Sequence, residues 1–137
     1  MSKYRSSLAL ATLAFFVALV VPFVAAAQHG FSVKQYGEFH DVLHPLEHEA
    51  LPNKDFRRIR IKSGELVKHG RRIVKLGVPA GTVDDQKADF KKELVKFNSA
   101  MTRFRADARK GSDAQLKTSY SALHDSFETL ASMLPRK

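Results

Sequence analysis

The feature that most constrains this chain is a pattern of apolar residues spaced by three and four, which recurs four times after residue 31. The cleanest run is Phe90, Leu94, Phe97, Met101, Phe104 and Ala108. An α-helix has about 3.6 residues per turn, so side chains at this spacing share one helix face. The run therefore predicts an amphipathic helix that buries that face.

Three further runs have the same period. They are Tyr36, Phe39, Leu43, Leu46 and Ala50; then Phe56, Ile59, Ser63, Leu66, Gly70 and Ile73; and finally Leu116, Tyr120, Leu123, Phe127, Leu130 and Leu134. Residues that typically begin a helix precede all four runs: Ser32 with Gln35, Asp55, Thr82 with Asp85, and Ser112 or Asp113. The small residues Ser63, Gly64 and Gly70 suggest that another helix approaches closely there.

Four such helices with short connections predict an all-α fold, an antiparallel up-down-up-down four-helix bundle. No stretch alternates with the period of two that marks a strand. We expect the aromatic residues of the four stripes, such as Phe97 and Phe127, to fill the core rather than to contact a cofactor.

The first residues have the pattern of a signal peptide. Lys3 and Arg5 precede an uncharged apolar run, residues 8–24, and three alanines follow at residues 25–27. We expect cleavage after Ala27, so that residues 28–137 form one periplasmic or secreted domain. The alternative is a membrane anchor formed by residues 8–24, which is short for a bilayer span.

Composition excludes several kinds of chemistry. The chain of 137 residues contains no cysteine, so it has no disulfide, no thiolate metal site and no covalent haem attachment through Cys-x-x-Cys-His. The formal net charge is +9. No nucleic-acid-binding motif accompanies that charge, so we expect no nucleic acid partner, whereas an acidic protein or an anionic membrane surface remains open.

Three of the six histidines lie in the stretch "FHDVLHPLEHEALP". His40, His44 and His48 are spaced by four residues, which stacks side chains on one flank of a helix. On a straight helix they lie about 80°, 120° and 160° from the centre of the buried face, which is near Leu43, so only His40 borders the core. Pro45 removes a backbone donor, and we expect a kink or bulge there. An extra residue in that turn would rotate His48 toward the core and replace Leu46 with Leu51 in the buried stripe. The sequence does not choose between this geometry and the straight helix.

The last helix supplies a candidate fourth histidine. His124 follows Leu123 in the buried stripe, and the first and last helices of such a bundle are neighbours, so His40 or His44 could meet it. Asp41, Glu47, Glu49 and Asp125 could act as oxygen ligands or as hydrogen-bond acceptors that orient the imidazoles. We interpret His69, on the second helix, as a surface residue. His29 would be the second residue after cleavage, where it could chelate copper.

The chain resembles the cytochrome c′ and cytochrome b562 group: an exported protein of about 110 residues after processing, with four helices and a histidine, His124, on the last. In place of the Cys-x-x-Cys-His motif of the c′ proteins it reads "SALHDSF", and its first helix lacks the methionine ligand of the b562 proteins. The stretch "FHDVLHPLEHEALPNKDF" is also similar to stretches in uncharacterised exported bundles without haem-binding cysteines. The resemblance therefore implies a relative that lacks covalent haem.

Three functions follow from these observations. The first is binding of copper or zinc by His40, His44, His48 and His124, because histidine and carboxylate ligands suit either ion. The second is a b-type haem carrier with two axial histidines, for which His40 or His44 would replace the methionine. The third is an interaction module that docks on an acidic partner or membrane surface. We expect no enzyme activity, because no nucleophile-base arrangement, carboxylate pair or phosphate loop can be assembled.

Overall fold

The computed structural model describes residues 30–136, and within that range every regular element is a helix. The elements are α1 (Lys34–Pro45), the π-helical turn η1 (Leu46–Ala50), α2 (Phe56–Leu76), the 3-10 turn η2 (Asp84–Gln86), α3 (Lys87–Lys110) and α4 (Asp113–Ser132). The expected all-α class is therefore confirmed for this part of the chain. The expected signal peptide, residues 1–27, lies outside the described residues. Between residues 30 and 136 no helix is long and apolar enough to cross a membrane.

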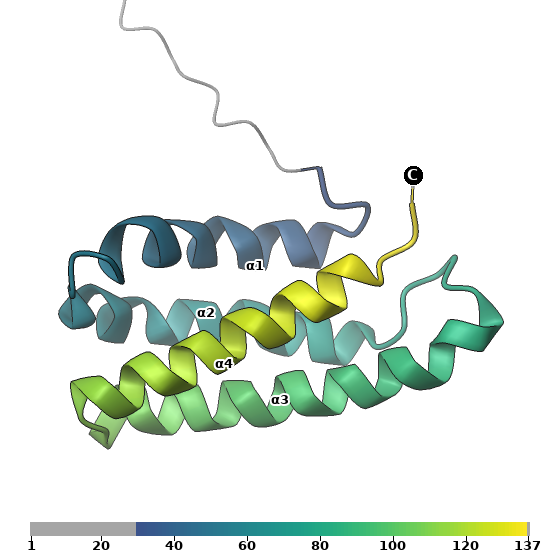
Figure 1. Ribbon diagram of the computed structural model, residues 1–137. Helices are drawn as coiled ribbons and strands as arrows, with labels where there is room; N and C mark the ends of the chain where they lie inside the picture. The colour runs from purple at the N-terminus through teal and green to yellow at the C-terminus, as the bar shows by residue number, and fades with distance from the viewer. Residues whose placement is uncertain (1–29, 137) are drawn as a thin grey trace, which may run out of the picture.

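The four long helices lie lengthwise along one another (Figure 1), with α4 running obliquely between α1 and α3. Each helix packs on the next in sequence, α1 on α2, α2 on α3 and α3 on α4. The first and last helices meet through side chains. The Tyr120 hydroxyl donates to the Leu43 carbonyl at 3.1 Å, and the Phe39 and Phe127 ring centroids are 4.7 Å apart. Aromatic side chains thus join the two helices that carry the candidate histidines.

The apolar stripes found in the sequence form the core. Every residue of the stripes on α1 with η1 and on α3 is buried. On α4 the stripe residues Leu116, Tyr120, Leu123, Phe127 and Leu130 are buried as well. Three members depart from the expectation: Phe56 and Ser63 are only partly buried, and Leu134 lies beyond the end of α4. The three-and-four spacing therefore identified the buried faces, because burial follows the helical period directly.

Two of the expected helix starts are confirmed. Asp55 caps α2, and its carboxylate accepts a hydrogen bond from the Arg58 backbone N–H at 3.0 Å. Ser112 caps α4 in a capping box with Gln115, in which each side chain bonds the backbone N–H of the other residue. These side chains satisfy amide groups that the first turn of a helix leaves without partners.

The predictions for the other two helix starts are wrong. Val33, not Ser32, precedes α1, and no side chain caps that helix. Its carbonyl accepts from the Tyr36 amide at 3.1 Å, so the first turn is closed by backbone alone. Thr82 donates its hydroxyl to the Pro79 carbonyl within the preceding turn, and α3 begins only at Lys87, after η2.

Close helix approach occurs at one of the small residues that the sequence singles out. A Cβ atom added to Gly70 would lie 2.5 Å from Met101 Sδ and 3.3 Å from the Phe39 ring. At Gly64 it would meet nothing within 4 Å. Gly70 therefore lets α2 lie against α3 and α1, whereas Gly64 faces solvent.

Candidate functional site

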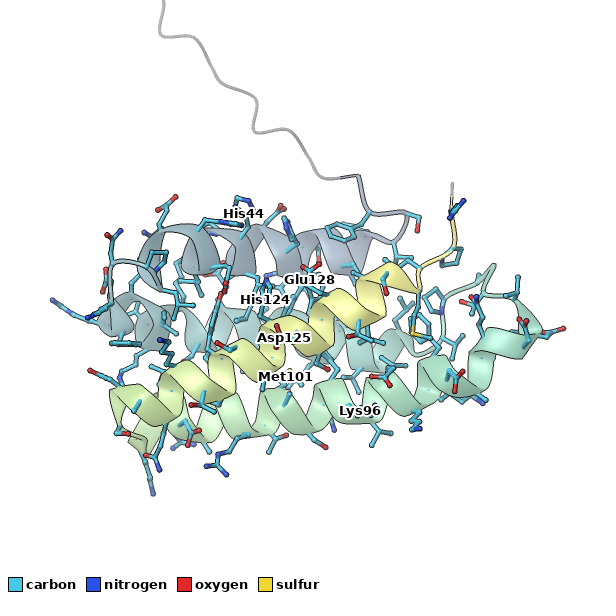
Figure 2. The ribbon with its side chains drawn as sticks, in the orientation of Figure 1. His44, Lys96, Met101, His124, Asp125 and Glu128 are labelled. Atoms are coloured by element: carbon cyan, nitrogen blue, oxygen red, sulfur yellow. The ribbon has the colours of Figure 1, made fainter. Side chains whose placement is uncertain are left out.

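The three histidines of the first helical segment form a stripe on one flank of α1 and η1. Imidazole ring centroids are 5.2 Å apart between His40 and His44 and 4.2 Å apart between His44 and His48. His40 is partly buried, and the other two are exposed. Figure 2 shows His44 on the outer edge of α1. These positions are the ones expected for a straight helix.

The bulge expected at Pro45 is present, because η1 is a π-helical turn that begins directly after the proline. The Leu51 amide donates to the Leu46 carbonyl at 2.9 Å, five residues back instead of four. Of the two positions that the sequence left open for His48, the structure has the outer one, since His48 stays exposed and Leu46 stays buried. The wider turn runs from Leu46 to Leu51 and includes His48, yet the His48 side chain remains on the solvent side of the segment.

His40 borders the aromatic core, as the sequence suggests. Its ring centroid lies 5.2 Å from that of Phe31 and 6.3 Å from that of Phe127 on α4. Because Phe127 also packs on Phe39, His40 is held at the rim of the layer between α1 and α4. The imidazole therefore has one apolar side.

The fourth histidine, His124, lies on the side of α4 that faces α1 (Figure 2). Its side chain is 26% exposed, and its Nδ1 atom lies 3.4 Å from the Asp125 Oδ1 atom. A carboxylate at this position favours a proton on Nδ1 and leaves Nε2 available as a ligand atom. Asp125 thus occupies the orienting position that the sequence suggests for it.

Two of the other acidic candidates, Glu49 and Asp41, have different surroundings. Glu49 accepts a hydrogen bond from the Arg58 guanidinium at 2.8 Å, so its carboxylate joins η1 to α2. Asp41 is exposed on α1. As the side chains are placed, residues 30–136 contain no group of three or more histidine or acidic side chains arranged to hold a metal ion. The closest pair in the stripe is His44 with His48.

A polar cluster between α1 and α2 was not predicted. The Glu38 carboxylate accepts a hydrogen bond from Arg72 at 2.9 Å and lies 3.4 Å from Lys34 Nζ. Burial acts to raise the pKa of the Glu38 carboxyl, but hydrogen bonds and positive charge from Arg72 and Lys34 outweigh it, so the pKa is lowered. The cluster borders a groove of about 430 Å³.

His69 belongs to the same cluster, and its interpretation as a surface residue is wrong. Its side chain is 18% exposed, and Nδ1 lies 3.6 Å from Glu38 Oε2. That buried nitrogen makes no hydrogen bond with the described residues. The sequence held little sign of this cluster, because Glu38 and His69 belong to different helices, and only the rotation of α2 against α1 brings them together.

A second unpredicted polar contact lies beneath the histidine stripe. Burial raises the pKa of the Tyr120 hydroxyl, and the neighbouring Glu47 carboxylate raises it further. The hydroxyl donates to the Leu43 carbonyl, and Glu47 Oε2 is buried without a hydrogen-bond partner among residues 30–136. Burial likewise raises the pKa of Tyr36, whose hydroxyl also lacks such a partner.

Comparison with known proteins adds no functional information to this geometry. No family model, no curated protein and no solved structure matches the chain. The resemblance to cytochrome c′ and cytochrome b562 therefore stays a prediction, and any function has to be argued from the residues themselves.

Proposed function

We propose that this protein binds a transition-metal ion, zinc or copper, through the histidines of α1 and η1. The observation that carries the proposal is the pair His44 and His48, whose ring centroids lie 4.2 Å apart on consecutive helical turns. Two imidazoles one turn apart can supply two nitrogen ligands to one ion, and imidazole suits both metals. Both side chains are exposed, so an ion can reach them from solvent.

The other two histidines would complete the ligand set. His40 extends the stripe by one turn, with its ring 5.2 Å from His44. His124 would be the ligand from the last helix, oriented by Asp125. In this arrangement His40 or His44 would share the ion with His124 across the contact between α1 and α4. Water would fill any remaining position, as zinc sites with three protein ligands commonly do.

We further propose that the protein is exported, is processed near Ala27 and has no catalytic activity. Its helices would form an antiparallel up-down-up-down bundle. Packing of each helix on its successor and the short connections between them support the bundle. The charged, apolar and small-residue segments of the first 27 residues support export.

Zinc is the first metal to test, because a new N-terminus that carries His29 at position two would take copper by itself. Untagged mature protein is titrated with zinc in a calorimeter, and thermal stability is recorded with and without the metal. We expect one ion per chain and a higher melting temperature. The affinity should fall about tenfold or more in His44→Ala and in His48→Ala.

Two further variants separate the ligand sets. His124→Ala lowers the affinity if the site joins α1 and α4, and leaves it unchanged if His44 and His48 act from the surface alone. His69→Gln is the matched control, since it removes an imidazole outside the stripe. Zinc binding that His44→Ala and His48→Ala both leave intact would contradict the proposal. A Soret band in the protein purified from its own source would replace it with the haem function.

A further inference from the structure

Positive charge is concentrated on two neighbouring helices. α2 carries eight basic and one acidic side chain, and α3 carries eight basic and three acidic side chains. By contrast, α1 with η1 carries one basic and four acidic side chains, and α4 carries one basic and three acidic side chains. The half of the molecule formed by α2 and α3 is therefore strongly positive, whereas the half that holds the candidate histidines is mildly negative.

Only some of these cations are neutralised. On the side of α2 that meets α1, Arg58 pairs with Glu49 at 2.8 Å and Arg72 with Glu38 at 2.9 Å. A second set is exposed and forms no ion pair with any residue between 30 and 136: Arg57, Lys68, Arg71, Lys75, Lys91, Lys92, Arg105, Arg109 and Lys110. Such uncompensated charge raises the electrostatic potential of this surface.

The unpaired cations of α2 lie on its outward side, between the flank toward α1, where Lys75 also lines the groove with Glu38, and the flank that faces α3. Arg60 marks this flank, because its guanidinium reaches the Asp107 and Ala108 carbonyls at the end of α3. With about 100° per residue, Arg71 lies roughly 20° from the direction of Arg60. By the same measure Arg57, Lys68 and Lys75 lie within about 80° of Arg60.

The unpaired cations of α3 lie on the matching flank. Phe104 packs on Tyr120 with ring centroids 5.9 Å apart, so it marks the side of α3 that faces α4. Lys91, Arg105 and Arg109 lie within about 40° of one another and at least about 100° away from Phe104, toward α2. We call the seven cations on these two flanks the basic seam: Arg57, Lys68, Arg71, Lys75, Lys91, Arg105 and Arg109.

The register of the two helices makes the basic seam continuous. Arg60 binds the end of α3, whereas Gly70 lies against Met101 in its middle. Arg57 and Arg109 are therefore at one end of the seam, and Lys75 and Lys91 are at the other. The 19 residues of α2 from Arg57 to Lys75 span a rise of about 27 Å, so the charge forms a long strip and not a single pocket.

Two exposed aliphatic side chains accompany the basic seam. Ile61 on α2 is 68% exposed, and Val95 on α3 is 67% exposed. Each lies four residues after a cation of the seam, about 40° around its helix from Arg57 or Lys91. Protruding aliphatic groups among lysine and arginine side chains are typical of surfaces that bind the lipid headgroup region.

We propose that the basic seam docks this protein on an anionic phospholipid surface, with the more acidic α1 and α4 turned toward solution. A charged strip along two helices suits a broad surface of many phosphates, to which each lysine or arginine contributes separately. A single acidic peptide would instead need a few converging cations and a groove between them. This docking does not depend on the histidines, so it stands or falls separately from metal binding.

Sedimentation with phospholipid vesicles tests the proposal. The protein is mixed with vesicles of phosphatidylcholine alone or of phosphatidylcholine with phosphatidylglycerol, and the bound fraction is measured at increasing NaCl. We expect binding only to the anionic vesicles, with release as salt screens the charge. The triple variant Arg71→Gln/Lys75→Gln/Lys91→Gln should lower the partition coefficient on the order of 100-fold, because each cation near the surface contributes about tenfold or less.

A matched variant removes the same charge from elsewhere. Lys54, Lys117 and Arg136 are exposed cations outside α2 and α3, and replacing all three with Gln should weaken binding much less. Ile61→Ser should lower the bound fraction and leave its dependence on salt unchanged. Equal losses in the two triple variants would overturn the proposal. So would an absence of binding to anionic vesicles, including the case in which the protein instead binds an acidic protein or a nucleic acid.

Discussion

The two tyrosines of the described chain are both fully buried, and their hydroxyls have different surroundings. Tyr120 donates a hydrogen bond to the Leu43 carbonyl, whereas the Tyr36 hydroxyl has no partner among residues 30–136. Burial raises the pKa of both hydroxyls. Each folded-state pKa therefore exceeds the unfolded value of about 10, and the neutral phenol is the form that the folded protein holds.

This shift predicts an alkaline limit to stability. The stabilisation that comes from a raised folded-state pKa is fully present below a pH of about 10, the unfolded pKa. It is lost as the pH rises from there through the folded-state pKa. Above pH of about 10 the free energy of unfolding should fall by about 1.4 kcal/mol per pH unit for each tyrosine. Urea denaturation of the mature protein at a series of pH values measures the slope.

Phenolate absorbance provides the matching readout. In the folded protein it should appear only together with the loss of helical circular dichroism, whereas in guanidinium both tyrosines should titrate near pH of about 10. High salt during the experiment limits the contribution of changing lysine charge. Phenolate that forms near pH of about 10 while the helices persist would show that these hydroxyls are accessible to solvent.

At the scale of the elements, Arg60 connects three helices. Its guanidinium donates to the carbonyls of Asp107 and Ala108 at 3.1 Å, to the Gly111 carbonyl at 2.9 Å and to Asp113 Oδ1 at 2.8 Å. The last carbonyls of α3 have no partner within the helix, and a cation there also interacts favourably with the helix dipole. One side chain of α2 thus stabilises the end of α3 and its connection to α4.

Arg60→Ala should lower the free energy of unfolding by about 2–3 kcal/mol, because it removes several hydrogen bonds from a charged donor to partly buried carbonyls. Arg60→Lys should recover only part of this, since a single ammonium group cannot reach all the acceptors that the planar guanidinium reaches. Urea denaturation monitored by circular dichroism measures both changes. Lys68→Ala, at an exposed and unpaired position of the same helix, should stay within about 0.5 kcal/mol of the parent. Equal effects of Arg60→Ala and Lys68→Ala would contradict the role of Arg60.

The sequence predicted the helices far better than their ends. A buried stripe such as Phe90 to Ala108 repeats one physical requirement over several turns, so a local error does not hide it. A helix start depends on a single residue. Asp55 and Ser112 cap as predicted, but Ser32 does not, because the backbone of Val33 closes the first turn of α1 one residue later.

The candidate site was predictable only where it lies within one helix. The spacing of His40, His44 and His48 was enough to predict their stripe, and the missing amide of Pro45 was enough to predict the bulge. The direction in which the bulge turns His48 was not encoded in that way, so the sequence left it open, and in the structure His48 stays exposed. The ion pair of Glu38 with Arg72 depends on how α1 and α2 pack, and no spacing along the chain reports it.

At the scale of the whole molecule, the uneven charge distribution opposes folding. The described residues contain 20 basic and 14 acidic side chains, and the cations of the basic seam lie on two helices that the fold brings together. Unfolding separates them, so their repulsion lowers the stability of the compact state. Ion pairs such as Arg58 with Glu49 act in the opposite direction, but exposed pairs contribute only up to about 1 kcal/mol each.

Added NaCl should therefore stabilise the protein. Raising the concentration from about 0.01 M to about 0.15 M shortens the screening length from about 30 Å to about 8 Å. Cations of the basic seam that lie farther apart than this shorter length then repel one another only weakly. A gain of about 1 kcal/mol would raise the melting temperature by roughly 4–8 °C in a domain of this size. Scanning calorimetry without metal or lipid measures the change.

The two triple variants assign this salt effect to its source. Arg71→Gln/Lys75→Gln/Lys91→Gln should melt at a higher temperature than the parent at low salt and should gain less from NaCl, because part of the repulsion is already gone. Lys54→Gln/Lys117→Gln/Arg136→Gln should keep the parent's gain, since its lost charges lie away from the basic seam. If NaCl lowers the melting temperature of the parent, the ion pairs between α1 and α2 dominate instead. The calorimetry and the vesicle experiment therefore examine two consequences of the same seven side chains, their mutual repulsion and their attraction to an anionic surface.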